Sequence, residues 1–149
     1  MAVSVQTDDF DIGRSLAELT EGRTDIGALV TFTGLVRDMP GGGLQAMELE
    51  HYPAMTEKAL REIEAEARKR WNLSASLIIH RIGRLQPGDR IMMVATGSAH
   101  RQDAFEAAEF LMDYLKSRAP FWKKEHTTEG ADWVDARESD EDALNRWRR

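Results

Sequence analysis

Residues 75–99 are ASLIIHRIGRLQPGDRIMMVATGSA, two mostly apolar runs on either side of the turn sequence QPGD. Apolar runs of this length around a Pro-Gly turn predict two strands paired as an antiparallel hairpin. A hairpin joins neighbouring strands directly, whereas a doubly wound fold places a helix between parallel strands. The stretch therefore favours an α+β fold with an antiparallel or mixed sheet and a small β subdomain.

Two long helices are expected to cover this sheet. Residues 53–71 carry an apolar stripe of Leu60, Ile63, Ala67 and Trp71. Their outer face has the spacing of i,i+4 ion pairs, namely Glu57/Arg61, Glu64/Arg68 and Glu66/Arg70. Residues 100–118 form the second helix, which ends before Pro120. Its predicted inward residues are Phe105, Ala108, Leu111, Met112 and Leu115.

Shorter elements complete the pattern. Residues 2–6 predict an opening strand, and residues 13–20 a short helix capped by Asp11. Residues 26–37 are β-branched and mostly apolar, which predicts a buried strand. The remaining predicted strands are 45–52, which alternates apolar and polar side chains, 121–127 and 133–139, and the polar segment 139–149 forms a short last helix.

Composition excludes several classes of function. The 26 acidic residues outnumber 20 basic ones, which argues against broad nucleic-acid binding. The absence of cysteine excludes disulfides, zinc-thiolate sites and cysteine nucleophiles. The four histidines have none of the usual metal-ligand spacings, so no metal site is expected. Neither a signal peptide nor a membrane-length apolar run is present, so we expect a cytoplasmic protein.

Two stretches gather positive charge. LKSRAPFWKKEH, residues 115–126, forms either a solvated turn or an anion pocket. SAHR, residues 98–101, lies at a helix start, where free N–H groups favour an anion, but it is equally a polar helix start capped by Ser98. Arg37 alone is typical of a solvated strand end, and the following loop, residues 38–43, is expected to be mobile. Local sequence does not establish that these cations converge.

Five segments stand out between about residues 26 and 140: TFTGLVRD, LEHYPAMTEKAL, HRIGRLQPGD, SAHRQDAFEAAEFLMDYLKSRAPFWKKE and WVDARESD. Together they resemble the MoaE family, the large catalytic subunits of molybdopterin synthase. The resemblance implies an α/β hammerhead fold in a single domain over residues 1–149. Residues 1–25 would be a variable N-terminal segment and residues 140–149 a polar tail.

The resemblance also implies an activity, sulfur transfer to cyclic pyranopterin monophosphate, which forms the molybdopterin dithiolene in molybdenum cofactor biosynthesis. The sulfur would come from the thiocarboxylated C-terminus of a small ubiquitin-like subunit, with no metal or cofactor. Two large subunits would form a homodimer within a heterotetramer. The alternatives are a noncatalytic anion-binding or scaffold relative and, disfavoured by the acidic balance, an RNA-binding domain.

Site residues follow from the resemblance by position. Lys116 and Lys123 would be the catalytic lysines, placed where the partner's tail enters, with Lys124 and Glu125 lining the same pocket. Arg37, His100 and Arg101 would hold the pterin phosphate, and Arg137 would complete an anion site, across the dimer. Leu35 stands where some relatives have a charged residue.

Overall fold

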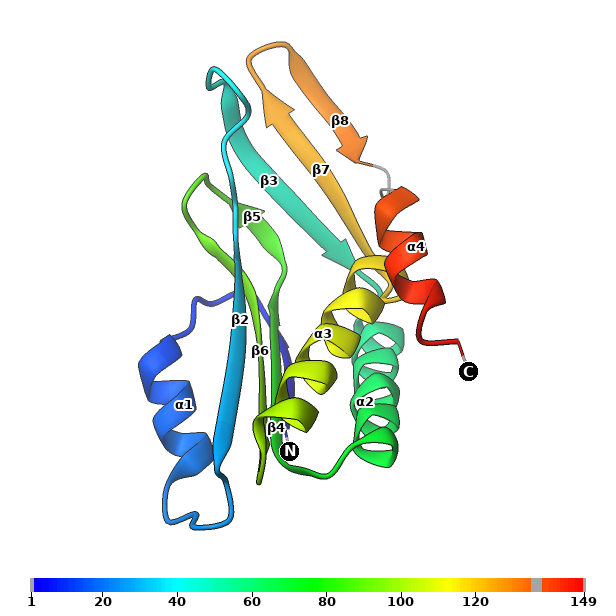
Figure 1. Cartoon of the computed structure of the whole chain (residues 1–149). Helices are drawn as coiled ribbons and strands as arrows, with labels where there is room; N and C mark the ends of the chain where they lie inside the picture. The colour runs from blue at the N-terminus through cyan, green and yellow to red at the C-terminus, as the bar shows by residue number, and fades with distance from the viewer. Residues whose placement is uncertain (1, 135–137, 149) are drawn as a thin grey trace.

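A computed structural model describes residues 2–134 and 138–148. The elements follow in the order β1 (Ala2–Gln6), α1 (Ile12–Thr20), β2 (Ala28–Leu35), β3 (Leu44–His51), α2 (Pro53–Arg70), β4 (Leu73–Arg81), β5 (Gly83–Leu85), β6 (Arg90–Ser98), α3 (Arg101–Ser117), β7 (Phe121–Thr127), β8 (Gly130–Val134) and α4 (Glu138–Asn145) (Figure 1). The described strands form two four-stranded sheets, with orders β1-β4-β6-β2 and β5-β3-β7-β8. The α+β fold class is therefore confirmed.

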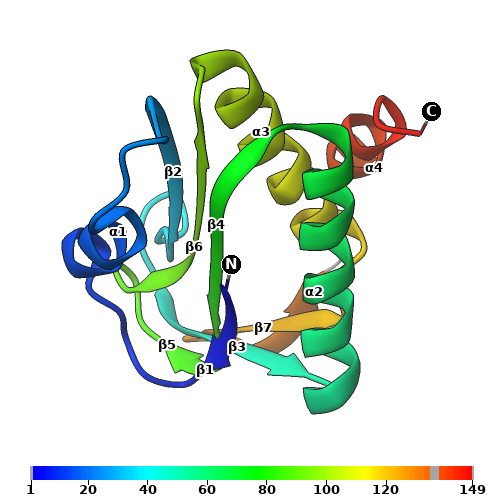
Figure 2. The same ribbon diagram turned by 90° about the horizontal axis from the view of Figure 1, so that it is seen from below.

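The predicted central hairpin is present, but its first strand is divided between the two sheets. β4 pairs antiparallel with β6, with Ile78 opposite Val94. At Gly83 the backbone has φ 89°, a conformation that favours glycine. From this residue the chain continues as β5, which belongs to the second sheet. There Leu85 lies opposite Met47 of β3. The strands of the second sheet run across those of the first (Figure 2), so this single stretch fixes how the two sheets are placed.

The central strands of the first sheet, β4 and β6, are covered on both faces. On one face, α2 and α3 cover β4 and β6 around a core that includes Leu60, Ile78 and Phe110. On the other, α1 packs against a smaller cluster that includes Ile79 and Met93. Because successive residues of a strand face opposite ways, Ser76, Ile78 and His80 share the α2/α3 side. The Asp11 cap of α1 is confirmed, since its side chain accepts from the backbone N–H of Arg14.

Three burial predictions are wrong, each for a tertiary reason. β2 is an edge strand, so its apolar Phe32 and Leu35 are 44% and 57% exposed. Phe105 of α3 is 59% exposed because the buried stripe of the helix passes through Ala104 and Ala108 instead, while Phe110 fills the interior. Glu64 is buried and accepts from the Ser76 hydroxyl at 2.8 Å, so it makes no outer-face pair. The other two predicted α2 pairs are present.

The chain after β8 packs closely against α3. Leu144 of α4 is only 1% exposed, and Trp147 packs edge-on against Phe110 with ring centroids 5.6 Å apart. The predicted last helix is thus part of the folded body. None of the helices in residues 2–134 and 138–148 combines the length and apolar character that crossing a membrane requires.

Candidate active site

Lys116 lies in the last turn of α3, just before the turn that leads into β7. That turn is closed by the backbone, since Phe121 N–H donates to the Ala119 carbonyl at 2.8 Å. The Pro120 carbonyl accepts from the buried hydroxyl of Thr56, on α2, at 3.0 Å. These hydrogen bonds fix the end of α3 and the beginning of β7 relative to each other. They therefore set where Lys116 and the next lysines lie.

The alternation of β7 separates its lysines. Phe121, Lys123 and Glu125 share one face of the strand, and Lys124 lies on the other. The ammonium of Lys124 lies over the indole of Trp133, 5.3 Å from the ring centroid, in a cation–π contact. The structure thus places Glu125 on the face of Lys123 and does not bring Lys124 to that face.

His80 lies beneath the beginning of β7 and was not singled out by the sequence analysis. Its imidazole stacks on the ring of Phe121, with centroids 3.8 Å apart and an interplanar angle of 16°. Its Nδ1 is 2.8 Å from the carbonyl oxygen of Arg81, and His80 is 6% exposed. The contact joins β4 of the first sheet to β7 of the second. The sequence signal was its position in β4, on the same side as buried Ile78.

The electrostatics of His80 show that both candidate lysines share its surroundings. Burial lowers the pKa of His80 to about 4, while the hydrogen bond to the Arg81 carbonyl acts in the opposite direction. The nearby charges of Lys123, Lys116 and His51 lower that pKa further. The imidazole is therefore neutral near pH 7. Lys116 and Lys123 therefore both lie near this ring.

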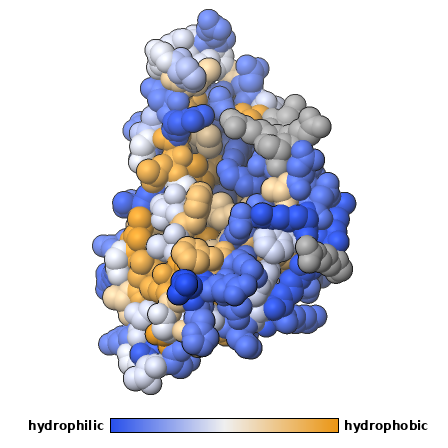
Figure 3. Space-filling view, viewed as in Figure 1, coloured by the Kyte–Doolittle hydropathy of each residue, from blue (hydrophilic) through white to orange (hydrophobic). Residues whose placement is uncertain are grey.

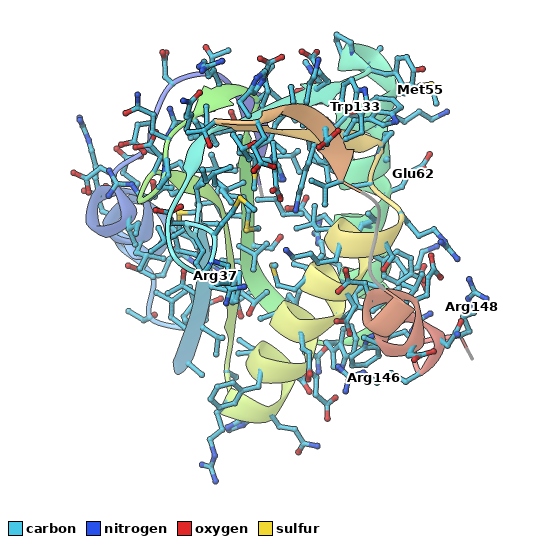
Figure 4. The ribbon with its side chains drawn as sticks, turned by 90° about the horizontal axis from the view of Figure 1, so that it is seen from above. Arg37, Met55, Glu62, Trp133, Arg146 and Arg148 are labelled. Atoms are coloured by element: carbon cyan, nitrogen blue, oxygen red, sulfur yellow. The ribbon has the colours of Figure 1, made fainter. Side chains whose placement is uncertain are left out.

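α4 and the residues beside it hold the same end of α3. The Ser117 hydroxyl donates to the Asp140 carbonyl at 2.9 Å, and Arg118 pairs with Glu141 at 2.6 Å. Farther along, Arg146 reaches back to α3 (Figure 4), where it pairs with Asp113 at 3.0 Å. These contacts restrain the helix turn that carries Lys116.

A second polar site lies at the opposite end of α3. The N-cap residue is His100, which makes no side-chain capping bond, so the predicted Ser98 cap is wrong. The Ser98 hydroxyl instead donates to the Asn72 carbonyl at 2.6 Å. The first-turn N–H groups and the positive end of the helix favour an anion here. Beside them is an open hollow of about 820 Å³ lined by Gly27, Ala28, Ala99, His100, Arg101, Gln102, Phe105 and Glu106.

Within one chain, the two ends of α3 are far apart. The rise of 1.5 Å per residue puts the Lys116 and Arg101 backbones about 22 Å apart along the helix axis. Arg37 is exposed beyond the end of β2 (Figure 4), whereas β2 starts beside His100, with Ala28 opposite Ser98. Arg37 and Arg101 are therefore also at opposite ends of the sheet. The predicted phosphate residues do not meet in a single chain.

Two further predictions concern Arg137 and metals. Arg137 lies outside the described residues, so the structure gives no position for it. Among residues 2–134 and 138–148, no group of three or more histidine, aspartate or glutamate side chains is arranged to hold a metal ion.

Comparison with known proteins decides the family. The model of the family described as MoaE protein matches residues 5–118. The chain belongs to the MoaE family. The molybdopterin synthase catalytic subunit of Cereibacter sphaeroides is 61% identical over 147 residues, covering 99% of this chain and 100% of that one. The solved MoaE protein of Burkholderia ambifaria superposes with a TM-score of 0.84 at 55% identity, covering 99% of both chains. Molybdopterin synthase from Staphylococcus aureus gives a TM-score of 0.81 at 32% identity, covering 89% of this chain and 96% of that one.

Proposed function

We propose that this chain is the catalytic subunit of a molybdopterin synthase, a sulfurtransferase. It takes sulfur from the thiocarboxylated C-terminus of a small ubiquitin-like subunit and adds it to cyclic pyranopterin monophosphate, forming the dithiolene. Membership of the MoaE family and 61% identity to a catalytic subunit support this function. The observation that carries the chemistry is the convergence of Lys116 and Lys123 around the neutral His80. The chain has no cysteine, so the sulfur must come from outside it, which suits a thiocarboxylated donor.

The two lysines suit different parts of this reaction. The thiocarboxylate sulfur is the nucleophile and attacks an oxygen-bearing carbon of the pterin side chain. The C–O bond at that carbon breaks, its oxygen leaving on the phosphate as the ring opens or as water, and the tail is linked to the substrate as a thioester. Water then attacks that thioester, which leaves sulfur on the substrate and a carboxylate on the tail. A second thiocarboxylated tail repeats the transfer, because the dithiolene holds two sulfurs. We assign Lys116 to the charge of the thiocarboxylate and of the tetrahedral adduct. Lys123 acts as general acid or base as the cyclic phosphate opens. Glu125 lies on the same strand face and completes the polar lining.

A homodimer would reunite the separated halves of the site. A substrate of pterin size cannot contact both Lys116 and Arg101 of one chain across about 22 Å. β2 is an edge strand with exposed Leu29, Phe32 and Leu35, and hydrophobic side chains gather along it in Figure 3. Such an edge favours pairing with another chain. In the proposed dimer, the phosphate-binding His100 and Arg101 of one chain lie against the lysines of the partner, with Arg37 and Arg137 at the same composite site.

Two further assignments concern Lys124 and the location of the protein. Lys124 is proposed to contact the small subunit rather than the pterin, because its ammonium lies over Trp133 on the other face of β7. The pathway it would serve, molybdenum cofactor biosynthesis, supports a cytoplasmic location for the protein.

The test is single-turnover conversion of cyclic pyranopterin monophosphate with thiocarboxylated small subunit. Wild-type protein should form product, and Lys116→Ala should lose at least about 100-fold in rate, the scale of one lost oxyanion donor. Lys58→Ala is the matched control, since Lys58 is an exposed lysine on α2 whose ion pair within the described residues is with Glu62. A wild-type protein that binds the small subunit yet forms no product would instead be a noncatalytic relative.

A further inference from the structure

His80 has one ring nitrogen fixed and one free. A carbonyl oxygen only accepts hydrogen bonds, so Nδ1, 2.8 Å from the Arg81 carbonyl, carries the hydrogen. In a neutral imidazole the other nitrogen, Nε2, is then an unprotonated acceptor. Backbone geometry thus selects the tautomer of this ring.

The free nitrogen reaches solvent. Among the described residues, Nε2 of His80 has no hydrogen-bond partner. In the same part of the chain, every fully buried side-chain nitrogen or oxygen does have one. Nε2 is therefore not fully buried, although His80 as a whole is only 6% exposed. A ring clamped by Phe121 and Arg81 presents a single acceptor to the outside.

The lysines are the cations within reach of this acceptor. Phe121, which stacks on His80, and Lys123 are two residues apart on the same face of β7, about 7 Å along the strand. A lysine side chain spans that distance. Lys116 and Lys123 both act on the charge of the ring, as does His51 at the end of β3. Of the charged groups acting on this ring, Lys116 and Lys123 each carry an ammonium, which is a hydrogen-bond donor.

We propose that His80 is a positioning residue for the lysine pair: its fixed, unprotonated Nε2 accepts a hydrogen bond from the ammonium of Lys123 or Lys116 when one of these long side chains turns toward it, although neither donates to it in the structure described. The acceptor favours the charged lysine and orients it toward the substrate. A stacked hydrocarbon ring in the same place would support β7 but would not hold the proton on the lysine. This role deepens the proposed sulfur transfer, and its effect on the rate rests on that function.

The decisive variant is His80→Phe, which keeps a ring on Phe121 and removes both nitrogens. Lysine labelled with ¹³C at Cε allows the two ammonium groups to be titrated by NMR in the dimeric protein, with signals assigned through Lys116→Arg and Lys123→Arg. We expect His80→Phe to lower one lysine pKa by about 0.5–1 unit, because the charged form loses its acceptor. His80→Gln, which retains an acceptor oxygen, should restore most of that pKa. Unchanged lysine titrations in both variants would overturn the proposal.

A second comparison separates loss of the acceptor from a general loss of stability. Ile79→Ala removes a buried side chain from the opposite side of the same strand, so it should lower the Tm without moving either lysine titration. In single-turnover reactions, the alkaline limb of the pH–rate profile should shift to lower pH in His80→Phe and stay in place in Ile79→Ala. The NMR titration needs no turnover, so it tests the role of His80 even if the protein does not transfer sulfur. If His80→Phe does not fold, His80→Leu, which also lacks an acceptor, takes its place. A lysine pKa lower in His80→Leu than in His80→Gln supports contact at Nε2, and equal lysine pKa values in the two variants oppose it.

Discussion

The indole Nε1 of Trp147 donates a hydrogen bond to the Asp113 carboxylate at 2.5 Å, which joins the residues after α4 to α3. Trp147 also packs edge-on against Trp71. We expect Trp147→Ala to lower the free energy of unfolding by about 3–4 kcal/mol, through lost packing and the lost indole hydrogen bond to Asp113. Arg148→Ala is the control, because Arg148 is exposed and should change stability by less than about 0.5 kcal/mol. Urea denaturation compares them; equal stabilities would show that Trp147 does not hold α3.

The depressed pKa of His80 makes stability depend on pH. Its pKa is 6.5 in the unfolded chain and about 4 in the folded one, so between these values the unfolded chain binds more protons. Stability should therefore be lost as pH falls from 6.5 to 4, by up to about 3 kcal/mol. Because His80→Phe removes this titration, the difference between wild type and variant in urea midpoint should change across that window. A constant difference would mean that His80 titrates normally.

Secondary structure was largely predictable because its signals are local. The strand at residues 121–127 and the helix ending before Pro120 follow from side-chain alternation and proline sterics, and both match the structure closely. Burial was less predictable, since it depends on which element covers which. The β2 sequence predicts a buried strand, but the position of β2 at the sheet edge leaves Phe32 exposed.

The positions of the candidate site residues could be proposed from the sequence, but their arrangement in space could not. Lys116 and Lys123 come together because a turn reverses the chain within a few residues. His80 was missed because its partner Phe121 is distant in sequence. The spacing of Glu64 likewise predicts an outer-face residue, because the sequence does not show that Ser76 of β4 donates a buried hydrogen bond to it. Long-range pairs of this kind leave no periodic signal in the chain.

Thr56 ties α2 to the turn before β7. Its buried hydroxyl accepts from Tyr52 N–H at 3.2 Å and donates to the Pro120 carbonyl at 3.0 Å. Thr56→Val keeps the shape and leaves both backbone groups unpaired, which should cost about 1–3 kcal/mol and slow single-turnover transfer by loosening β7. Thr24→Val, at an exposed position, should change neither. Thermal denaturation and transfer rates compare the pair; a stable, fully active Thr56→Val would contradict this anchoring role.

Gly27 permits the close approach of two chain segments beside His100. A Cβ at this position would collide with the Ala99 carbonyl oxygen, which is backbone and cannot move aside cheaply. Gly27→Ala should therefore lower the Tm and raise KM for the pterin, by displacing the helix start that carries Arg101. Gly13→Ala is the matched control, since its Cβ has room in α1 and should stabilise by up to about 1 kcal/mol. An unchanged KM in Gly27→Ala would separate this helix start from substrate binding.

Mixed dimers test whether the two ends of α3 act across the homodimer. Lys116→Ala and Arg101→Ala chains each disable both sites of their own dimers. If each site takes lysines from one chain and Arg101 from the partner, a mixed dimer holds one intact site and one doubly defective site. Random remixing of equal amounts should then restore about a quarter of wild-type activity. Sites built within single chains would give no recovery on remixing. Phe32→Asp in both chains supplies the control, because a charge on the exposed β2 edge should prevent dimerisation and abolish the recovery.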